Sequence, residues 1–254
     1  LSCGTCAACG AGEESLCPAF QLLGEHRHGT MAEYVVVPEV NLAPVPPAMP
    51  WATAAAFPLA TLTAWRMLVT RARLAPGETV LIWGIGGGVS QALLRIARHL
   101  GATTIVTSGS DAKLAHARAD GADHVVNHAT GDVVAAVRAA TANRGADVVA
   151  DSVGEPTWPS SLRALRRGGR LVTCGATGGP HVTLDVRRLY WHQWSLLGST
   201  MGSRAEFAAV TALAAEGELW PRVVAVVPLE RATSAFRRLA AGEQLGKLVI
   251  EVMP

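Results

Sequence analysis

Four of the five cysteines lie near the start of the chain, at a spacing that suits metal binding. They are Cys3, Cys6, Cys9 and Cys17, in the pattern C-x2-C-x2-C-x7-C. Tight C-x2-C turns present thiolates from a small loop, and a structural zinc ion takes four such ligands in tetrahedral geometry. An iron–sulfur cluster, chance clustering or disulfides are the alternatives. The gap before Cys17 is longer than the last spacing of a ferredoxin-type run, so we predict zinc.

A glycine-rich turn that begins at Gly84 is the second stretch whose residue types suggest a binding site. An apolar run precedes it, and a helical pattern with apolar residues at i, i+3, i+4 and i+7 follows it. Gly84, Gly87 and Ser90 fit G-x-x-G-x-x-small, whereas G-x-G-x-x-G fails at Val89. A turn of this kind leaves backbone N–H groups free at a helix N-terminus, where dinucleotide phosphates bind. We therefore predict a pyrophosphate site here.

Strand-like and helix-like segments alternate from Thr79 to about Ser203. We predict strands at 80–83, 103–107, 123–126, 147–151, 170–174 and 195–199. We predict helices at 89–100, 111–118, 130–142 and 158–167. Such alternation predicts an α/β fold with a Rossmann-type, doubly wound parallel sheet, which binds ligands at the carboxyl ends of its strands.

The segments on either side of this region have a mixed pattern. We predict a strand at 32–38, an apolar helical stretch at 53–69 broken at Pro58, helices at 204–216 and 230–241, and strands at 222–227 and 247–252. His26 and His28 form an H-x-H pair, which is more typical of an exposed loop than of a metal site.

Composition excludes several classes of protein. Half of the residues are apolar, 17% are charged and the net charge is +2, so a large core is possible and nucleic-acid binding is not indicated. No uncharged apolar run reaches the about 18 residues of a membrane helix, and no signal peptide is visible. We expect a cytoplasmic protein that binds neither nucleic acid nor membrane.

The four-cysteine lobe is followed by A-E-Y-V-V-V-P, by P-L-A-T-L-T-A-W and by the glycine turn. The order of these motifs resembles the medium-chain dehydrogenase/reductase superfamily, and within it the zinc-type alcohol dehydrogenase-like proteins. The likeness continues through Gly121-Ala122-Asp123, Gly168-Gly169-Arg170-Leu171-Val172 and Gly246-Lys247-Leu248-Val249. It implies an NAD(P)-dependent enzyme that transfers hydride between a nicotinamide cofactor and an alcohol or carbonyl substrate.

The resemblance also implies a split architecture. Residues 61–203 would form the dinucleotide-binding domain, and 1–60 with 204–254 would form a partial GroES-like, mainly β catalytic domain with a structural zinc lobe at 3–17. Part of that domain would lie upstream of Leu1. A Cys or acidic zinc ligand of the alcohol dehydrogenases falls at Leu59 here, and leucine cannot bind zinc.

Cofactor preference can be considered at the end of the second predicted strand. NAD enzymes have an acidic residue at this position, which binds the ribose of the cofactor. Here the position is occupied by Ser108, and Lys113 follows five residues later. Serine, unlike a carboxylate, does not repel a 2′-phosphate, and Lys113 could form an ion pair with that phosphate. We therefore expect NADP(H) rather than NAD(H). The alternative is that Ser110 caps a helix and that Lys113 is a solvated helix residue.

Further cofactor contacts are implied by position in the family, with ordinary strand-end loops as the alternative. They are Thr63, Gly87, Gly88, Val89, Ser152, Val153, Gly154, Cys174, Gly175, Ala176, Ser199, Thr200 and Met201. Of these, Cys174 is expected to be a buried small hydrophobe. No catalytic acid or base can be assigned.

Three other functions remain open. One is a zinc-free NADPH quinone or enoyl reductase, and another is a non-catalytic fragment that binds NADP(H) and zinc. The third is a serine hydrolase, because Ser90 lies in an elbow-like turn and Asp151 with His181 or His192 follows in chain order. We also expect a homodimer or homotetramer joined through the edge at 195–200, since an apolar edge strand needs covering.

Overall fold

The computed structural model describes residues 1–253, and these form two compact units. The first unit comprises residues 1–62 together with 201–253 of the described chain, and the second unit comprises residues 63–200. The two are described separately below. None of the helices in the described chain combines the length and hydropathy needed to cross a bilayer.

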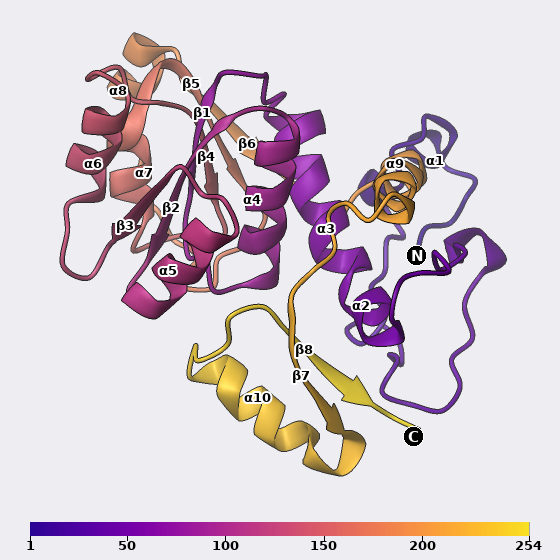
Figure 1. Ribbon diagram of the computed structural model, residues 1–254. Helices are drawn as coiled ribbons and strands as arrows, with labels where there is room; N and C mark the ends of the chain where they lie inside the picture. Colours follow the sequence, from indigo (N-terminus) through magenta and orange to yellow (C-terminus); the bar gives the residue numbers. More distant parts are fainter. Residues whose placement is uncertain (254) are drawn as a thin grey trace. The chain divides into compact units, whose positions relative to one another are not determined.

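The unit of residues 63–200 is built on a six-stranded parallel sheet in the order β3-β2-β1-β4-β5-β6 (Figure 1). Its strands are β1 (Thr79–Ile82), β2 (Thr103–Ser108), β3 (His124–Asn127), β4 (Ala146–Asp151), β5 (Leu165–Thr173) and β6 (Ser195–Gly198). This confirms the predicted doubly wound sheet. The strand order reverses between β1 and β4, and that switch point is where folds of this kind bind their ligands.

Helices cover both faces of this sheet (Figure 1). α4 (Gly88–His99) and α5 (Asp111–Ala119) lie on one face. α6 (Val133–Ala140), α7 (Trp158–Ala164) and α8 (Val186–His192) lie on the other. A π-helical segment, η3 (Arg66–Arg71), follows α3 (Pro58–Trp65) and leads toward β1.

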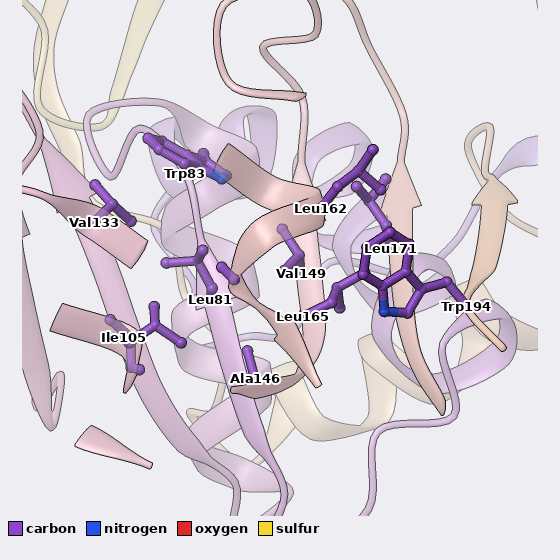
Figure 2. Packing of buried hydrophobic residues seen from close by; sticks show 12 residues of the cluster. Leu81, Trp83, Ile105, Val133, Ala146, Val149, Leu162, Leu165, Leu171 and Trp194 are labelled. Carbon is purple, nitrogen blue, oxygen red and sulfur yellow. The ribbon is translucent and has the colours of Figure 1, made fainter. Parts of the chain in front are cut away.

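Successive side chains of the buried strands point to opposite faces of the sheet, so the hydrophobic core has a part on each face. Leu81, Ile105, Val149 and Leu171 join a cluster with residues of α6 and α7, and Trp194 closes it (Figure 2). Their neighbours along the strands, such as Val80 and Ile82, are equally buried but lie outside that cluster. Burial on both faces explains why these strands read as continuous apolar runs.

Two details of this unit differ from the prediction. The helix predicted at 158–167 ends at Ala164, because Leu165 already pairs with Ala146 and begins β5. The helix α8 was not predicted between the last two strands. Its exposed side includes Tyr190 and Trp191, so it lacks the polar outer face that identifies an amphipathic helix in sequence.

The other unit holds the cysteine lobe, several helices and one small sheet. Its elements are α1 (Ala7–Gly10), η1 (Glu14–Leu16), η2 (Glu39–Asn41), α2 (Trp51–Ala56), α9 (Arg204–Ala215), η4 (Leu229–Arg231) and α10 (Ala232–Ala240), with the parallel pair β7 (Val223–Pro228) and β8 (Lys247–Glu251). The predicted break at Pro58 is confirmed, since it separates α2 from α3.

The strand predicted at 32–38 is wrong. This segment pairs with no strand among the described residues, and Tyr34 and Val36 are 87% and 96% exposed. A β-type sequence forms a strand only where a neighbour supplies hydrogen bonds, which composition alone cannot reveal.

Candidate functional site

The structure brings the four predicted cysteines together at one point of the first unit. Their sulfur atoms all lie within 4.8 Å of one another. Cys6 Sγ is 3.5 Å from Cys9 Sγ, and Cys3 Sγ is 4.0 Å from Cys9 Sγ. Cys9 and Cys17 are buried, whereas Cys3 is exposed at the rim. No disulfide joins them, so the alternative of a disulfide pair is not realised.

This arrangement fits one tetrahedral ion. Four thiolates at about 2.3 Å from zinc would stand about 3.8 Å apart, close to the two sulfur separations above. The backbone also supports anionic sulfur, since the N–H of Cys3 donates to Cys17 Sγ at 3.4 Å. Backbone hydrogen bonds from Thr5 and Cys6 lower the pKa of the Cys3 thiol to about 6. The donor set is therefore suited to a soft cation such as zinc.

The glycine turn forms the predicted entrance to α4. Gly84 has a φ of +68°, a conformation that favours glycine, and the N–H of Gly87 donates back to the Gly84 carbonyl at 3.3 Å. Gly87 is the N-cap of α4, and no side chain caps this helix. The first N–H groups of α4 therefore face outward without a side-chain acceptor, as a bound phosphate requires.

Ser90 has a structural task in this turn. It is 3% exposed, and its hydroxyl lies 2.6 Å from the Gly84 carbonyl and 2.9 Å from that of Gly87. The small third position of the motif thus ties the turn together with a hydrogen bond. The same contacts contradict the serine hydrolase, because a nucleophile must be exposed and next to a base.

Asp151 is also occupied elsewhere. This fully buried carboxylate accepts hydrogen bonds from Thr157 Oγ1 and Ser161 Oγ, both at 2.8 Å, and from the N–H groups of Val153 and Gly154. It shapes the loop after β4 rather than orienting a histidine. Sequence analysis missed this role, although an Asp at the end of a buried strand needs hydrogen-bond donors.

Most of the predicted cofactor residues gather at the carboxyl edge of the sheet. Ser108 ends β2, Ser152 and Val153 follow β4, and Cys174 and Gly175 follow β5. Ser199 and Thr200 follow β6, and the Ser199 hydroxyl is buried without a hydrogen-bond partner in the described chain. An orphaned polar atom at this edge fits a bound polar group.

Two of the predicted residues, Thr63 and Met201, have a different setting. Thr63 is buried in α3 and not at a strand end. Met201 belongs to the first unit and has a φ of +48°. Cys174, which was expected to be buried, is only partly buried. Burial, followed by the nearby Asp151 charge, raises the pKa of its thiol to about 11, which does not suit a nucleophile.

The hydrogen bonds in the turn after β2 favour the alternative in which Ser110 caps a helix. The Ser110 hydroxyl accepts a hydrogen bond from the backbone N–H of Lys113 at 3.5 Å and is the N-cap of α5. Ser108 is 5% exposed, and its hydroxyl accepts from the Ser110 N–H at 3.1 Å. Both serines therefore serve the turn itself, whereas a 2′-phosphate site needs groups that face outward.

Two family models match the chain. Residues 88–216 match the zinc-binding dehydrogenase model, and residues 1–47 match the GroES-like domain of alcohol dehydrogenases. The chain is an α/β oxidoreductase of the medium-chain dehydrogenase/reductase class. It belongs to the zinc-binding dehydrogenase family.

Individual relatives agree with this assignment. The chain is 33% identical to an NAD-dependent alcohol dehydrogenase of Sulfolobus acidocaldarius, over 98% of this chain and 72% of the relative. It is similar to the crystal structure of an NAD-dependent alcohol dehydrogenase, with 45% identity, a TM-score of 0.95, and coverage of 100% of this chain and 74% of that one.

A third relative is much longer than this chain. The chain is 35% identical to the spectinabilin polyketide synthase system protein NorB of Streptomyces orinoci, over 89% of this chain. It spans only 10% of that relative's length.

The relatives bear on the alternatives as well. They do not favour the zinc-free quinone or enoyl reductase. The expected preference for NADP(H) finds no support either, because the two alcohol dehydrogenases above are named as NAD-dependent.

Proposed function

We propose that the protein transfers hydride between a nicotinamide dinucleotide and a small alcohol or carbonyl compound, with NAD(H) as its cofactor. The uncapped N-terminus of α4 behind the glycine turn is the observation that carries this proposal. It stands at the switch point between β1 and β4, where doubly wound sheets bind dinucleotides. When bound, the nicotinamide ring would supply or accept the hydride.

The residues of the chain would bind and orient that cofactor. The N–H groups of Gly88 and Val89 would hold the pyrophosphate, aided by the positive end of the α4 dipole. Ser90 keeps the turn in the shape that exposes them. The buried, unpartnered hydroxyl of Ser199 would meet the carboxamide after β6. Orientation of this kind is a large part of catalysis in hydride transfer.

We also propose that zinc binds to Cys3, Cys6, Cys9 and Cys17 and acts structurally. Four thiolates complete the coordination sphere of zinc and leave no open position for a substrate. Leu59, at the family's ligand position, has a hydrocarbon side chain in α3 that is 53% exposed. This chain therefore offers no ligand there for a second zinc ion.

The variant Val89→Asp tests the cofactor site, with Val89→Asn as the matched neutral control. Val89 lies in the first turn of α4, where a carboxylate favours the helix but repels a pyrophosphate. NADH binding, followed by nicotinamide fluorescence, should weaken at least about tenfold in Val89→Asp and much less in Val89→Asn. Equal binding by all three proteins would reject the proposed site.

A further inference from the structure

The edge of the sheet at which the strands begin carries a group of arginines with no part in the cofactor site. Six of the 22 arginine and lysine residues of the chain, but only one of its 20 acidic residues, lie between Trp158 and Trp194. This segment comprises α7, β5 and α8. The rest of the chain is acidic overall, so positive charge is concentrated in one part of the second unit.

Hydrogen bonds join the ends of the helices on this face of the sheet. Arg138, in the last turn of α6, donates from Nη2 to the carbonyl of Arg163, in the last turn of α7, at 3.2 Å. Trp194, which follows α8, donates from Nε1 to the carbonyl of Arg166 in β5 at 2.9 Å. The start of a strand follows each of these helices, so their ends lie at the edge opposite the glycine turn.

Half of the arginines in the segment are neutralised by carboxylates. The ion pairs are Arg166 with Asp147 and Glu78, Arg170 with Glu78, and Arg187 with Asp185. The other three, Arg163, Arg167 and Arg188, are exposed and form no ion pair with a carboxylate of the described chain. We call these three the arginine cluster. Their charges are available to an anion from outside the chain.

Helix stability accounts for only part of this cluster. A cation in the last turn of a helix is stabilised by the helix dipole, and Arg138 and Arg163 both have that position. Arg167, however, lies in β5, and Arg188 lies in the first turn of α8, where a positive charge is unfavourable. The dipole therefore leaves Arg167 and Arg188 unexplained.

Tryptophan rings hold the guanidinium groups of these two arginines. Arg167 lies over Trp191 at 5.8 Å from the ring centre, and Arg188 lies over Trp194 at 5.5 Å. Such contacts restrict an arginine side chain before binding, so less entropy is lost when a partner pairs with it. Burial, and then the charges of Arg167 and Arg188, lower the pKa of His192, which stacks on Trp194. The surface therefore favours negative charge.

The distribution of charge favours a compact acidic partner. A nucleic acid or an anionic membrane would extend beyond the cluster and meet a chain that is acidic elsewhere. A protein segment can pair its carboxylates with the arginines alone, because a guanidinium binds a carboxylate through two parallel hydrogen bonds. Trp191, which is 68% exposed, adds the kind of aromatic contact on which protein interfaces depend.

We propose that the arginine cluster docks an acidic segment of another protein, whose Asp or Glu side chains pair with Arg163, Arg167 and Arg188. Docking at this edge of the sheet leaves the carboxyl edge open. The partner is therefore held without closing the proposed cofactor site, and the inference does not depend on that site.

The probe is a fluorescein-labelled, glutamate-rich helical peptide, and the same peptide with glutamine in place of glutamate is its control. Fluorescence anisotropy with the full chain should show micromolar binding of the glutamate peptide and no binding of the glutamine peptide. Binding should weaken about threefold in Arg167→Gln and at least about tenfold when Arg188→Gln is added. It should also weaken with rising salt, because exposed charges are screened.

Arg187→Gln is the matched control, because Arg187 adjoins the cluster but pairs with Asp185. It should change the affinity much less, and every variant should keep a cooperative unfolding transition. An unbound glutamate peptide, or equal losses in Arg187→Gln and Arg167→Gln, would overturn the inference. Tighter binding of polyphosphate or of phosphatidylserine vesicles than of the peptide would do the same. So would an oligomer that dissociates in the double variant while the peptide affinity stays unchanged, since the cluster would then join copies of this chain.

Discussion

Glu14 and Arg204, far apart in sequence, form a bidentate pair in the first unit. The Glu14 carboxylate accepts hydrogen bonds from Arg204 Nε at 2.7 Å and from the Arg204 backbone N–H at 3.2 Å. Glu14 lies between Cys9 and Cys17 of the lobe and is 8% exposed, and Arg204 is the first residue of α9. The pair therefore joins the cysteine lobe to a helix N-terminus, where a negative charge is favoured.

Replacing Glu14 by glutamine should destabilise the fold by about 1–2 kcal/mol, because the charged hydrogen bonds to Arg204 weaken. Urea unfolding would measure the loss, with Glu25→Gln in an exposed loop as the control. Although burial alone would raise it, the pKa of Glu14 is lowered by the hydrogen bonds from Arg204. This stabilisation is therefore present above the usual glutamate pKa and is lost as the pH falls below it. Equal stability of both variants would contradict the assigned role.

The sheet could be predicted from sequence because its central strands are buried on both faces. Runs such as 80–83 and 147–151 are apolar throughout, and glycines separate them from helices with clear periodicity. The cysteine cluster was predictable for a related reason, since spacing within a short loop restricts where the sulfur atoms can lie.

Contacts between distant segments could not be predicted in this way. Tyr34-Val35-Val36-Val37 has strand composition but no partner strand in the described chain. The sequence could not exclude a serine hydrolase, because the order of residues along the chain does not show that Ser90 and Asp151 form hydrogen bonds with backbone groups. The hydrogen bond from Asn127 to Asp111 likewise depends on the register between β3 and the start of α5.

The cysteine lobe should hold one zinc ion per chain. Elemental mass spectrometry of the purified protein would count it. Cys9→Ser, which replaces a buried ligand, should lose the metal and make the lobe sensitive to proteolysis, because the binding free energy of such a site is folding free energy. Cys174→Ser is the matched control and should retain the zinc. A metal-free wild type, or zinc retained without loss in Cys9→Ser, would reject the site.

Asp147 should contribute strongly to the stability of the second unit. It is 3% exposed and accepts hydrogen bonds from Arg144, from Arg166 and from the Thr79 N–H at 2.8 Å. Burial alone would raise its pKa, but hydrogen bonds from Arg144, Thr79 and Arg166 lower the pKa to about 2.

Asp147→Asn should therefore cost about 3 kcal/mol, since it leaves two arginines without their buried partner. The lowered pKa means that this stabilisation is complete above the unfolded value near 3.8 and is lost as the pH falls toward 2. Urea unfolding between pH 2 and pH 7 would follow both effects, with Asp132→Asn as a control that should change stability little, because asparagine caps a helix about as well as aspartate. Parallel pH profiles for wild type and Asp147→Asn would contradict this prediction.

The protein should form at least a dimer through the region of β6 and α8. β6 is an edge strand of the sheet, and Tyr190 and Trp191 of α8 are 64% and 68% exposed. An open strand edge and exposed aromatic side chains in one unit are features that association would cover. Light scattering should give at least twice the mass of one chain.

The variant Tyr190→Lys should shift this equilibrium toward the monomer by at least about tenfold, as the loss of an aromatic interface residue does. Val36→Lys is the control, because Val36 is 96% exposed and belongs to the other unit. Unequal effects of the two variants would locate the interface on the sheet unit. A monomeric wild type at micromolar concentration would contradict this prediction. It would mean that the edge of β6, with its half-buried Leu196 and Leu197, is not covered by a second chain.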